Sequence, residues 1–317
     1  MAFGEHRAPR ISSWEARALR EHCQHFSRLG WALFAQGASA LVVQVAAVLA
    51  VQWAAPALLG NITFLWVLST LSVYGVGFPL FVLIAGPVPT APTTQPRRPL
   101  GPVRFFQVYL IGLALLYLSN LATLFLLELV GILRGEAVSN PVESIQDYPV
   151  VLNLVLGCLV APFVEEVMFR KVLLDRLRPY GDRFAIGASA LCFGLFHGNF
   201  NQIPYAAALG LVFGYVALRT GCLWQTILLH AMVNFIATGL IPLLELWGDW
   251  GEELLGALIL GSIFLGVVFL IVRRRELRAA PGQYGLSQGR TWRLFFENPG
   301  VIVFCLLALL ESLSYFL

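Results

Sequence analysis

The sequence predicts an all-α membrane protein, a polytopic bundle of about 8–9 transmembrane helices around a polar intramembrane cavity. Of the 317 residues, 58% are hydrophobic and 12% are charged, whereas about 25% of residues are charged in a soluble domain. The apolar residues also gather into stretches close to the length that spans a bilayer. This composition excludes an ordinary soluble enzyme, a disordered chain and a nucleic-acid-binding protein.

Residues 1–30 are polar and amphipathic and contain five arginines and three glutamates. A signal peptide would place its apolar stretch nearer the start, but the first apolar run begins at Trp31. We therefore expect a cytosolic tail over residues 1–30 and a first span that is retained. Residues 31–148 are then predicted to form the N-terminal transmembrane helices.

The remaining apolar runs give the other elements in order. The loops at 87–104 and 279–298 are rich in residues that do not favour helices. The fifth and sixth spans are short, so we expect them to be tilted or to cross incompletely. The nine predicted spans cover residues 31–53, 64–86, 105–133, 149–172, 184–199, 203–218, 222–244, 254–272 and 299–317.

The basic residues favour this alternation. Segments 1–30, 87–104, 173–183, 219–221 and 273–298 fall on one side and, with Lys171, hold 19 of the 21 basic residues. Only Arg134 and Arg170 are exceptions. The positive-inside rule then predicts a multi-pass cell-membrane protein with a cytosolic N-terminus and an external C-terminus.

Few ionisable residues lie inside the predicted spans, and each is a functional candidate because burying a charge in a bilayer is costly. Glu165, Glu166 and Arg170 lie in the fourth span. Glu166 and Arg170 are spaced i,i+4 and can pair, while Glu165 points about 100° away and can face a cavity. A purely structural role for this triplet, as acids stabilised near the cytosolic end, is the alternative.

Two histidines complete the set. His197 lies four residues after Phe193, and His230 lies one turn before Asn234. Alone, each could be an interfacial or helix-linking polar residue. At 1.5 Å per residue, however, Glu165, His230 and His197 lie roughly 15, 14 and 21 Å from the cytosolic face, so the three clusters can meet.

Together these motifs resemble those of the CPBP family, the CAAX protease and bacteriocin-processing (Abi) intramembrane endopeptidases. The resemblance rests on GluGluxxxArg at 165–170, PhexxxHis at 193–197 and HisxxxAsn at 230–234. It covers a core at residues 149–246 and leaves residues 247–317 as C-terminal transmembrane helices without assignment.

The resemblance implies peptide-bond hydrolysis by activated water, with a peptide or protein substrate that includes lipidated peptides. It implies that Glu165 and His197 activate the water and that His230 and Asn234 form an oxyanion hole. Glu166 and Arg170 would hold the site together.

The sequence alone leaves open whether the predicted site binds a metal ion. The family is often called metalloproteases, and Glu165, His197 and His230 could bind zinc with one open position. The sequence has no HisGluxxHis motif, and Asn234 suits an oxyanion donor better than a zinc ligand, so we favour a site without metal.

Three other functions are alternatives to a protease. A non-catalytic family member could act in bacteriocin immunity or as a membrane scaffold. A transporter would usually show paired repeats with broken helices, and the sequence shows none. A rhomboid-type serine protease would need a nucleophilic serine, but Ser189 lacks the GlyxSerGly context.

Overall fold

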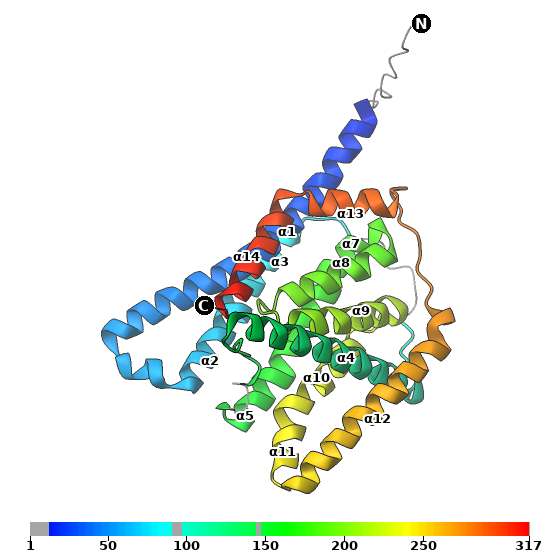
Figure 1. The fold of residues 1–317 in the computed structure, drawn as a ribbon. Coiled ribbons are helices and arrows are strands. Elements are labelled where there is room, and N and C mark those ends of the chain that lie inside the picture. The colour runs from blue at the N-terminus through cyan, green and yellow to red at the C-terminus, as the bar shows by residue number, and fades with distance from the viewer. Residues whose placement is uncertain (1–12, 91–96, 144–146, 317) are drawn as a thin grey trace, which may run out of the picture.

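The computed structural model describes residues 13–90, 97–143 and 147–316, and within these ranges the elements are all helical (Figure 1). Seven helices there are long and apolar enough to cross a membrane, and the bent C-terminal pair adds an eighth if it counts as one span. The predicted all-α polytopic bundle is thereby confirmed.

The N-terminal part contains one long helix, a broken returning span and a third span. Helix α1 begins well before the predicted first span, so the described part of the predicted tail is helical; residues 1–12 lie outside the described residues. Asn61 caps the returning span by accepting from the Phe64 amide. The elements are α1 (Ser13–Ala54), η1 (Pro56–Gly60), α2 (Ile62–Thr70), the π-helical η2 (Leu71–Gly77), α3 (Phe78–Ala85) and α4 (Pro102–Arg134).

The next span runs from Val150 to Tyr180 and carries the first motif. Its helix alternates between α and π hydrogen bonding, a pattern that recurs at functional sites. The π-helical segments lie on both sides of α6, which contains Pro162 and both glutamates. The elements are α5 (Val150–Leu152), η4 (Asn153–Val160), α6 (Ala161–Glu166), η5 (Val167–Leu174), α7 (Asp175–Leu177) and η6 (Arg178–Tyr180).

The predicted fifth span at 184–199 needs a correction. It is the 14-residue helix α8 (Asp182–Leu195), about 21 Å long, which is short of the roughly 30 Å of hydrocarbon. Gly198 follows with a positive φ of 60°, which turns the chain away. Two membrane-length spans come next: α9 (Ile203–Thr220), then α10 (Leu223–Phe235) continued by η7 (Ile236–Leu240) and α11 (Ile241–Glu245).

The C-terminal region adds one long helix and one bent pair. Helix α12 (Asp249–Arg273) ends in η8 (Arg274–Glu276). Helices α13 (Gln288–Phe296) and α14 (Pro299–Ser314) meet at 67°. The predicted loop at 279–298 therefore contains a helix, and the predicted ninth span at 299–317 is the second half of a bent pair and too short to be a membrane-length helix alone. Asn298 caps α14 through the Gly300 amide and also donates to the Cys23 carbonyl, which ties the bend to α1.

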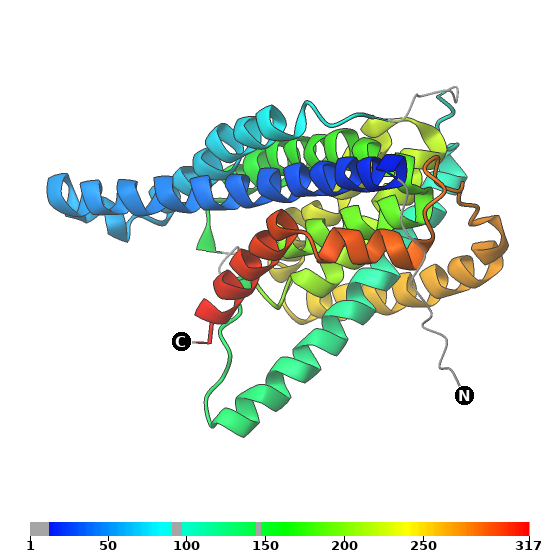
Figure 2. The ribbon, with the colours of Figure 1, turned by 90° about the horizontal axis from the view of Figure 1, so that it is seen from above.

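Close helix contacts depend on small residues. A Cβ on Gly266 of α12 would lie 2.2 Å from the Leu110 carbonyl oxygen of α4, and one on Gly210 of α9 would lie 2.8 Å from Ala190 Cα of α8. Such small residues let membrane helices pack closely. Close packing is needed because lipid supplies no hydrophobic driving force for helix association. Viewed from above, α1 and the returning α2–α3 span lie side by side along one edge, away from α4 (Figure 2).

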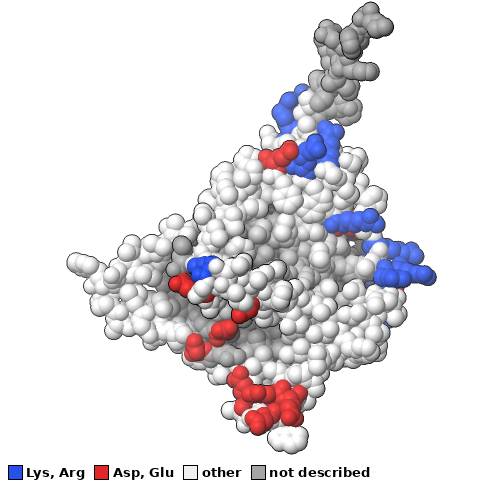
Figure 3. Space-filling model, in the orientation of Figure 1, with Lys and Arg blue, Asp and Glu red and all other residues white. Residues whose placement is uncertain are grey.

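The loops gather at two opposite ends of the bundle. We define the basic end as residues 86–90, 97–104, 178–183, 219–222 and 273–298, and the acidic end as residues 55–61, 134–143, 147–150, 196–202, 245–253 and 315–316. In Figure 3, Lys and Arg cover the upper and right parts, and Asp and Glu gather lower down, around the turn from α11 to α12.

Contacts within each end match the predicted alternation. At the basic end, the Arg98 amide donates to the Thr220 carbonyl at 2.9 Å, and the Gln283 amide to the Pro179 carbonyl at 2.7 Å. At the acidic end, Asn201 donates to Asn140 at 2.6 Å. Loops predicted to share a membrane side therefore lie together. Which end faces the cytosol follows from the positive-inside rule alone.

Candidate active site

Glu166 and Arg170 lie one helical turn apart and pair, as their spacing predicted. Arg170 Nε lies 3.2 Å from Glu166 Oε2, and neither side chain is exposed. Arg170 Nη1 donates to the Ser189 hydroxyl at 3.1 Å, and the guanidinium lies 4.8 Å from the centroid of the Phe193 ring. These α8 partners fix Arg170 in the interface between the helices.

Glu165 faces away from Arg170 and has different partners. The Tyr74 hydroxyl of η2 donates to Glu165 Oε1. The other carboxylate oxygen lies 3.8 Å from His230 Nε2. Glu165 is only 5% exposed, so its carboxylate is positioned by a tyrosine and a histidine from two other spans.

His230 lies between the two glutamates. Its Nδ1 is 3.2 Å from Glu166 Oε1, and because the paired carboxylate accepts, Nδ1 carries the proton. Nε2 therefore points toward Glu165. The ring stacks on Phe213 at 5.3 Å and meets the edge of Phe193 at 5.6 Å. These contacts fix the orientation of the imidazole.

Asn234 lies one turn beyond His230 on α10. Its Nδ2 donates to the Gly157 carbonyl of η4 at 2.8 Å. An amide nitrogen has two hydrogens, so one remains for a second acceptor. The predicted pair of His230 and Asn234 therefore lies on one helix face with its donor groups held by neighbouring spans.

His197 lies just beyond the end of α8. Its Nδ1 is 2.8 Å from the Phe193 carbonyl. Because a carbonyl only accepts, Nδ1 is the donor and Nε2 of the neutral ring carries a lone pair. The ring packs edge-on against Phe193 at 5.1 Å, so the Phe193–His197 contact inferred from the sequence is present.

One cavity of about 470 Å³ brings the motif residues together. Glu165, His197, His230 and Asn234 line it, whereas Glu166 and Arg170 lie behind its wall. Ser189 is wholly buried, donates to the Phe169 carbonyl and does not line the cavity. The volume falls within the usual range of about 300–1,000 Å³ for ligand sites.

The cavity lies in the half of the bundle nearest the acidic end. Its lining residues come from the stretch of each span between the middle and that end, for example Tyr117 to Leu124 of α4 and Tyr205 to Leu209 of α9. Asn140 and Asn201, whose side chains hydrogen-bond at the acidic end, line it as well. The cavity thus runs from mid-bundle toward the acidic end.

The charges of the buried cluster balance only with one extra proton. Two carboxylates, Glu165 and Glu166, face one permanent cation, Arg170. An uncompensated buried charge costs several kcal/mol, so a positive charge on His230 would balance the second carboxylate. A doubly protonated His230 would donate from Nε2 as well as from Nδ1.

The sequence did not predict several polar residues of this cavity. Tyr74 is the most important, because it is bonded directly to Glu165. Asn140, Asn201, Gln202 and Tyr205 also line the cavity. The only sequence signal for Tyr74 is its place among Ser72, Gly75 and Gly77 in an otherwise apolar span, and such residues are common in packed membrane helices.

The predicted alternative zinc set does not form a ligand cluster. Within the described residues, no three His, Cys, Asp or Glu side chains are grouped closely enough to hold a metal ion. Glu165 and His230 approach each other, and the bonds of Glu165 to Tyr74 and of His197 to Phe193 each leave one donor atom unused. The preference for a site without metal stays a prediction.

Comparisons with known proteins fall on this same region. Residues 147–236 match the family model described as "Type II CAAX prenyl endopeptidase Rce1-like". A protein of Bacillus subtilis (strain 168) named "Putative membrane peptidase YdiL" is 30% identical over 93 residues. That match covers 29% of this chain and 37% of the relative, so the chain spans little more than a third of the length of the curated relative it matches. No solved structure matches.

The fold and the site define a polytopic membrane protein with a polar cavity inside the helix bundle. Over residues 147–236 the chain is similar to the Rce1-like CAAX endopeptidases, so the resemblance inferred from the three motifs is confirmed for that region. The N-terminal spans and α12–α14 lie outside this similarity.

Proposed function

We propose that this protein is an intramembrane endopeptidase that hydrolyses a peptide bond with a water molecule activated by Glu165 and His197. The observation that carries the proposal is the single cavity lined by Glu165, His197, His230 and Asn234. Its four groups supply a base, an imidazole that accepts a hydrogen bond from the water and two donors, which are the parts that acyl hydrolysis by water requires.

Glu165 is the general base in this mechanism. One carboxylate oxygen is held by the Tyr74 hydroxyl, and the other, which lies 3.8 Å from His230 Nε2, takes the proton of the water. His197 orients that water through Nε2, which carries a lone pair because Nδ1 donates to the Phe193 carbonyl. The water transfers a proton to Glu165 as its oxygen bonds to the scissile carbonyl carbon.

His230 and Asn234 stabilise the oxyanion. The carbonyl oxygen gains a negative charge in the tetrahedral intermediate and accepts from His230 Nε2–H and from the second Asn234 Nδ2–H. Donors fixed in advance are effective because they need no reorganisation in the transition state, and both side chains are fixed by Glu166 and Gly157.

Collapse of the intermediate completes the reaction. The proton held by Glu165 moves to the leaving amine nitrogen as the carbon–nitrogen bond breaks, which gives a carboxylic acid and an amine and restores the base. Glu166 and Arg170 touch no reacting atom in this scheme. They are positioning residues that hold His230 and neutralise the wall behind it.

The position of the cavity indicates where the substrate enters. Since it runs toward the acidic end, and the positive-inside rule places that end outside, the scissile bond approaches from the outer half of the membrane. We therefore propose a membrane-anchored or exported peptide as substrate, lipidated peptides included.

The test is peptide cleavage by the purified protein in nanodiscs. We expect wild type to cleave members of a library of prenylated and unmodified peptides, and Glu165→Gln and His197→Ala to lose about 10²–10⁴-fold in kcat/KM, the usual contribution of a general base. His22→Gln is the matched control, because His22 bonds to Tyr180 far from the cavity.

The same experiment separates the alternatives. Activity that survives a chelator supports the mechanism without metal; loss with chelator and rescue by zinc would overturn it. Wild-type turnover by Glu165→Gln would remove Glu165 from the chemistry. Folded wild-type protein that cleaves no member of the library would favour a non-catalytic immunity or scaffold role.

A further inference from the structure

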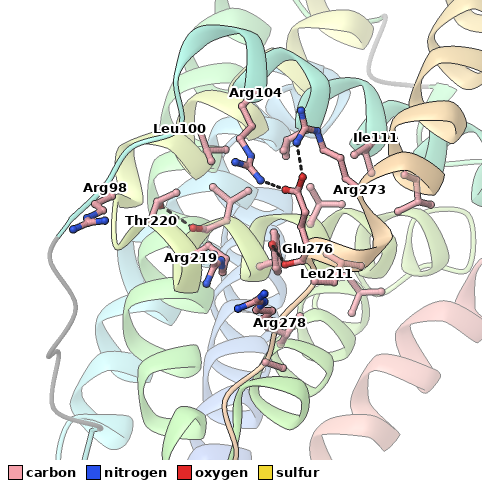
Figure 4. Close-up of a pocket in the computed structure, with 18 of the residues that line it drawn as sticks. Arg98, Leu100, Arg104, Ile111, Leu211, Arg219, Thr220, Arg273, Glu276 and Arg278 are labelled. Carbon is pink, nitrogen blue, oxygen red and sulfur yellow. Dashed lines mark hydrogen bonds and ion pairs between the residues drawn. The ribbon is translucent and has the colours of Figure 1, made fainter.

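A second cavity, of about 690 Å³, lies at the basic end of the bundle. It is enclosed by the start of α4, the C-terminal half of α9, the end of α12 and the first turn of α8, and it shares no lining residue with the catalytic cavity. Nothing in the proposed peptidase mechanism uses it. Figure 4 shows Arg104 and Arg273 pointing toward Glu276, with Arg219 and Arg278 close to each other beside them and Arg98 at the edge of the cavity.

The lining is strongly cationic. Six arginines face one acidic residue, Glu276. Glu276 is bonded to two of them, Arg104 and Arg273, the latter at 2.8 Å. Among the described residues, the other four make no ion pair; they are Arg98, Arg183, Arg219 and Arg278.

The frame that carries these arginines is fixed by hydrogen bonds. Gln225 of α10 accepts from the Leu100 amide at 2.9 Å and donates to the Leu100 carbonyl at 3.0 Å. Next to it, the Arg98 amide bonds to the Thr220 carbonyl. On the other side, the Tyr215 hydroxyl donates to the Glu276 carbonyl. The cationic rim is therefore built into the fold.

Below the rim the cavity is apolar. Its deeper wall is formed by aliphatic side chains of α4, α9 and α12, namely Ile111, Leu115, Leu211, Val212 and Leu270. Leu211 is 47% exposed, so this wall also faces the region that lipid occupies. A cationic rim above an apolar wall is complementary to an anionic amphiphile: guanidinium groups bind phosphate in a planar, bidentate manner, and the wall can accept an acyl chain.

We propose that this cavity binds an anionic phospholipid, with its phosphate at Arg219 and Arg278 and an acyl chain against α4 and α9. A free phosphate would leave the apolar wall uncovered, and a neutral lipid would leave the arginines without a counter-charge. Basic pockets between transmembrane helices are known to bind lipid headgroups in this way. The proposal is independent of the peptidase function.

The test measures lipid binding to the full-length protein purified in detergent, by thermal stability and by native mass spectrometry. Phosphatidylglycerol is expected to raise Tm and to remain bound, whereas phosphatidylcholine and inorganic phosphate at equal concentration are not. Arg219→Gln combined with Arg278→Gln is expected to weaken phosphatidylglycerol binding at least tenfold, since each lost charge-assisted contact is worth about tenfold or more.

The matched control is Arg274→Gln combined with Arg275→Gln. These arginines are exposed on the same segment, carry the same charge and do not line the cavity, so this variant should bind like wild type. Arg219→Lys combined with Arg278→Lys keeps the charge without the bidentate geometry and should bind phosphatidylglycerol with intermediate affinity. Equal stabilisation by phosphatidylcholine, equal binding of inorganic phosphate, or equal losses in the cavity and control variants would each overturn the proposal.

Discussion

The two cavities of this protein are built in opposite ways. The cavity near the acidic end, which we propose to be catalytic, has few charges, and each is fixed by partners within the bundle. The basic-end cavity has six arginines, and among the described residues four of them have no acidic partner. Buried charges must be paired because lipid and protein solvate them poorly. Arginines at a rim can remain without an acidic partner until a ligand binds. Charges paired within the fold therefore mark the cavity that we propose for peptide hydrolysis, and arginines without an acidic partner mark the cavity that we propose for lipid binding.

The largest expected effect comes from breaking the pairing behind the catalytic cavity. Arg170→Met should destabilise the protein by about 3–5 kcal/mol, because it leaves a buried carboxylate without compensation. Adding Glu166→Gln should restore much of that stability. The measurement is the thermal unfolding midpoint in detergent, and an unchanged midpoint for the single variant would show that the pair is not a structural requirement.

A smaller effect is expected at Tyr74. Tyr74→Phe removes the hydroxyl that holds Glu165 but keeps the ring, so kcat should fall about ten- to hundredfold, as for other hydrogen bonds to a charged group. Tyr117→Phe is the control, because Tyr117 lines the same cavity without a hydrogen bond to Glu165. Equal effects of the two substitutions on kcat, measured by peptide cleavage, would argue against a positioning role for Tyr74.

The variants expected to perturb the protein least test on which side of the membrane each end of the bundle lies. In a background where Cys23 and Cys305 are alanine, Glu136→Cys should react with a membrane-impermeant maleimide added outside intact cells. Arg275→Cys should react only in inverted vesicles. Protein fold and cleavage should be unaffected, because both side chains are exposed and line neither cavity. The reverse labelling pattern would invert the topology and move substrate entry to the cytosolic side.

The fold was largely predictable because hydropathy and the placement of arginines are local properties of the sequence. One exception was α8, where the predicted fifth span ends early at a glycine with positive φ. The other was the bent α13–α14 pair, which replaces a predicted loop and a straight ninth span. The glutamates were also predictable in part, since helical periodicity alone separates Glu165 from the Glu166–Arg170 pair. Their chemical roles are still proposals.

The rest depends on contacts between distant segments. The Tyr74–Glu165 hydrogen bond joins residues 91 positions apart, and no local sequence pattern predicts it. The arginines at 98, 219 and 278 looked like topology markers in the sequence, because each follows or precedes an apolar run. Only packing of α4, α9 and α12 shows that they surround one cavity.

The i,i+4 pair of Glu166 and Arg170 also has a consequence for biosynthesis. A lone acid or arginine costs roughly 2.5–3.5 kcal/mol at the centre of an inserting helix, and this segment carries three such groups within six residues. Pairing on the same helix neutralises two of them before any other span arrives. Glu165 keeps its cost until Tyr74 and His230 dock against it, so an unassembled intermediate retains an exposed polar group that membrane quality control can recognise.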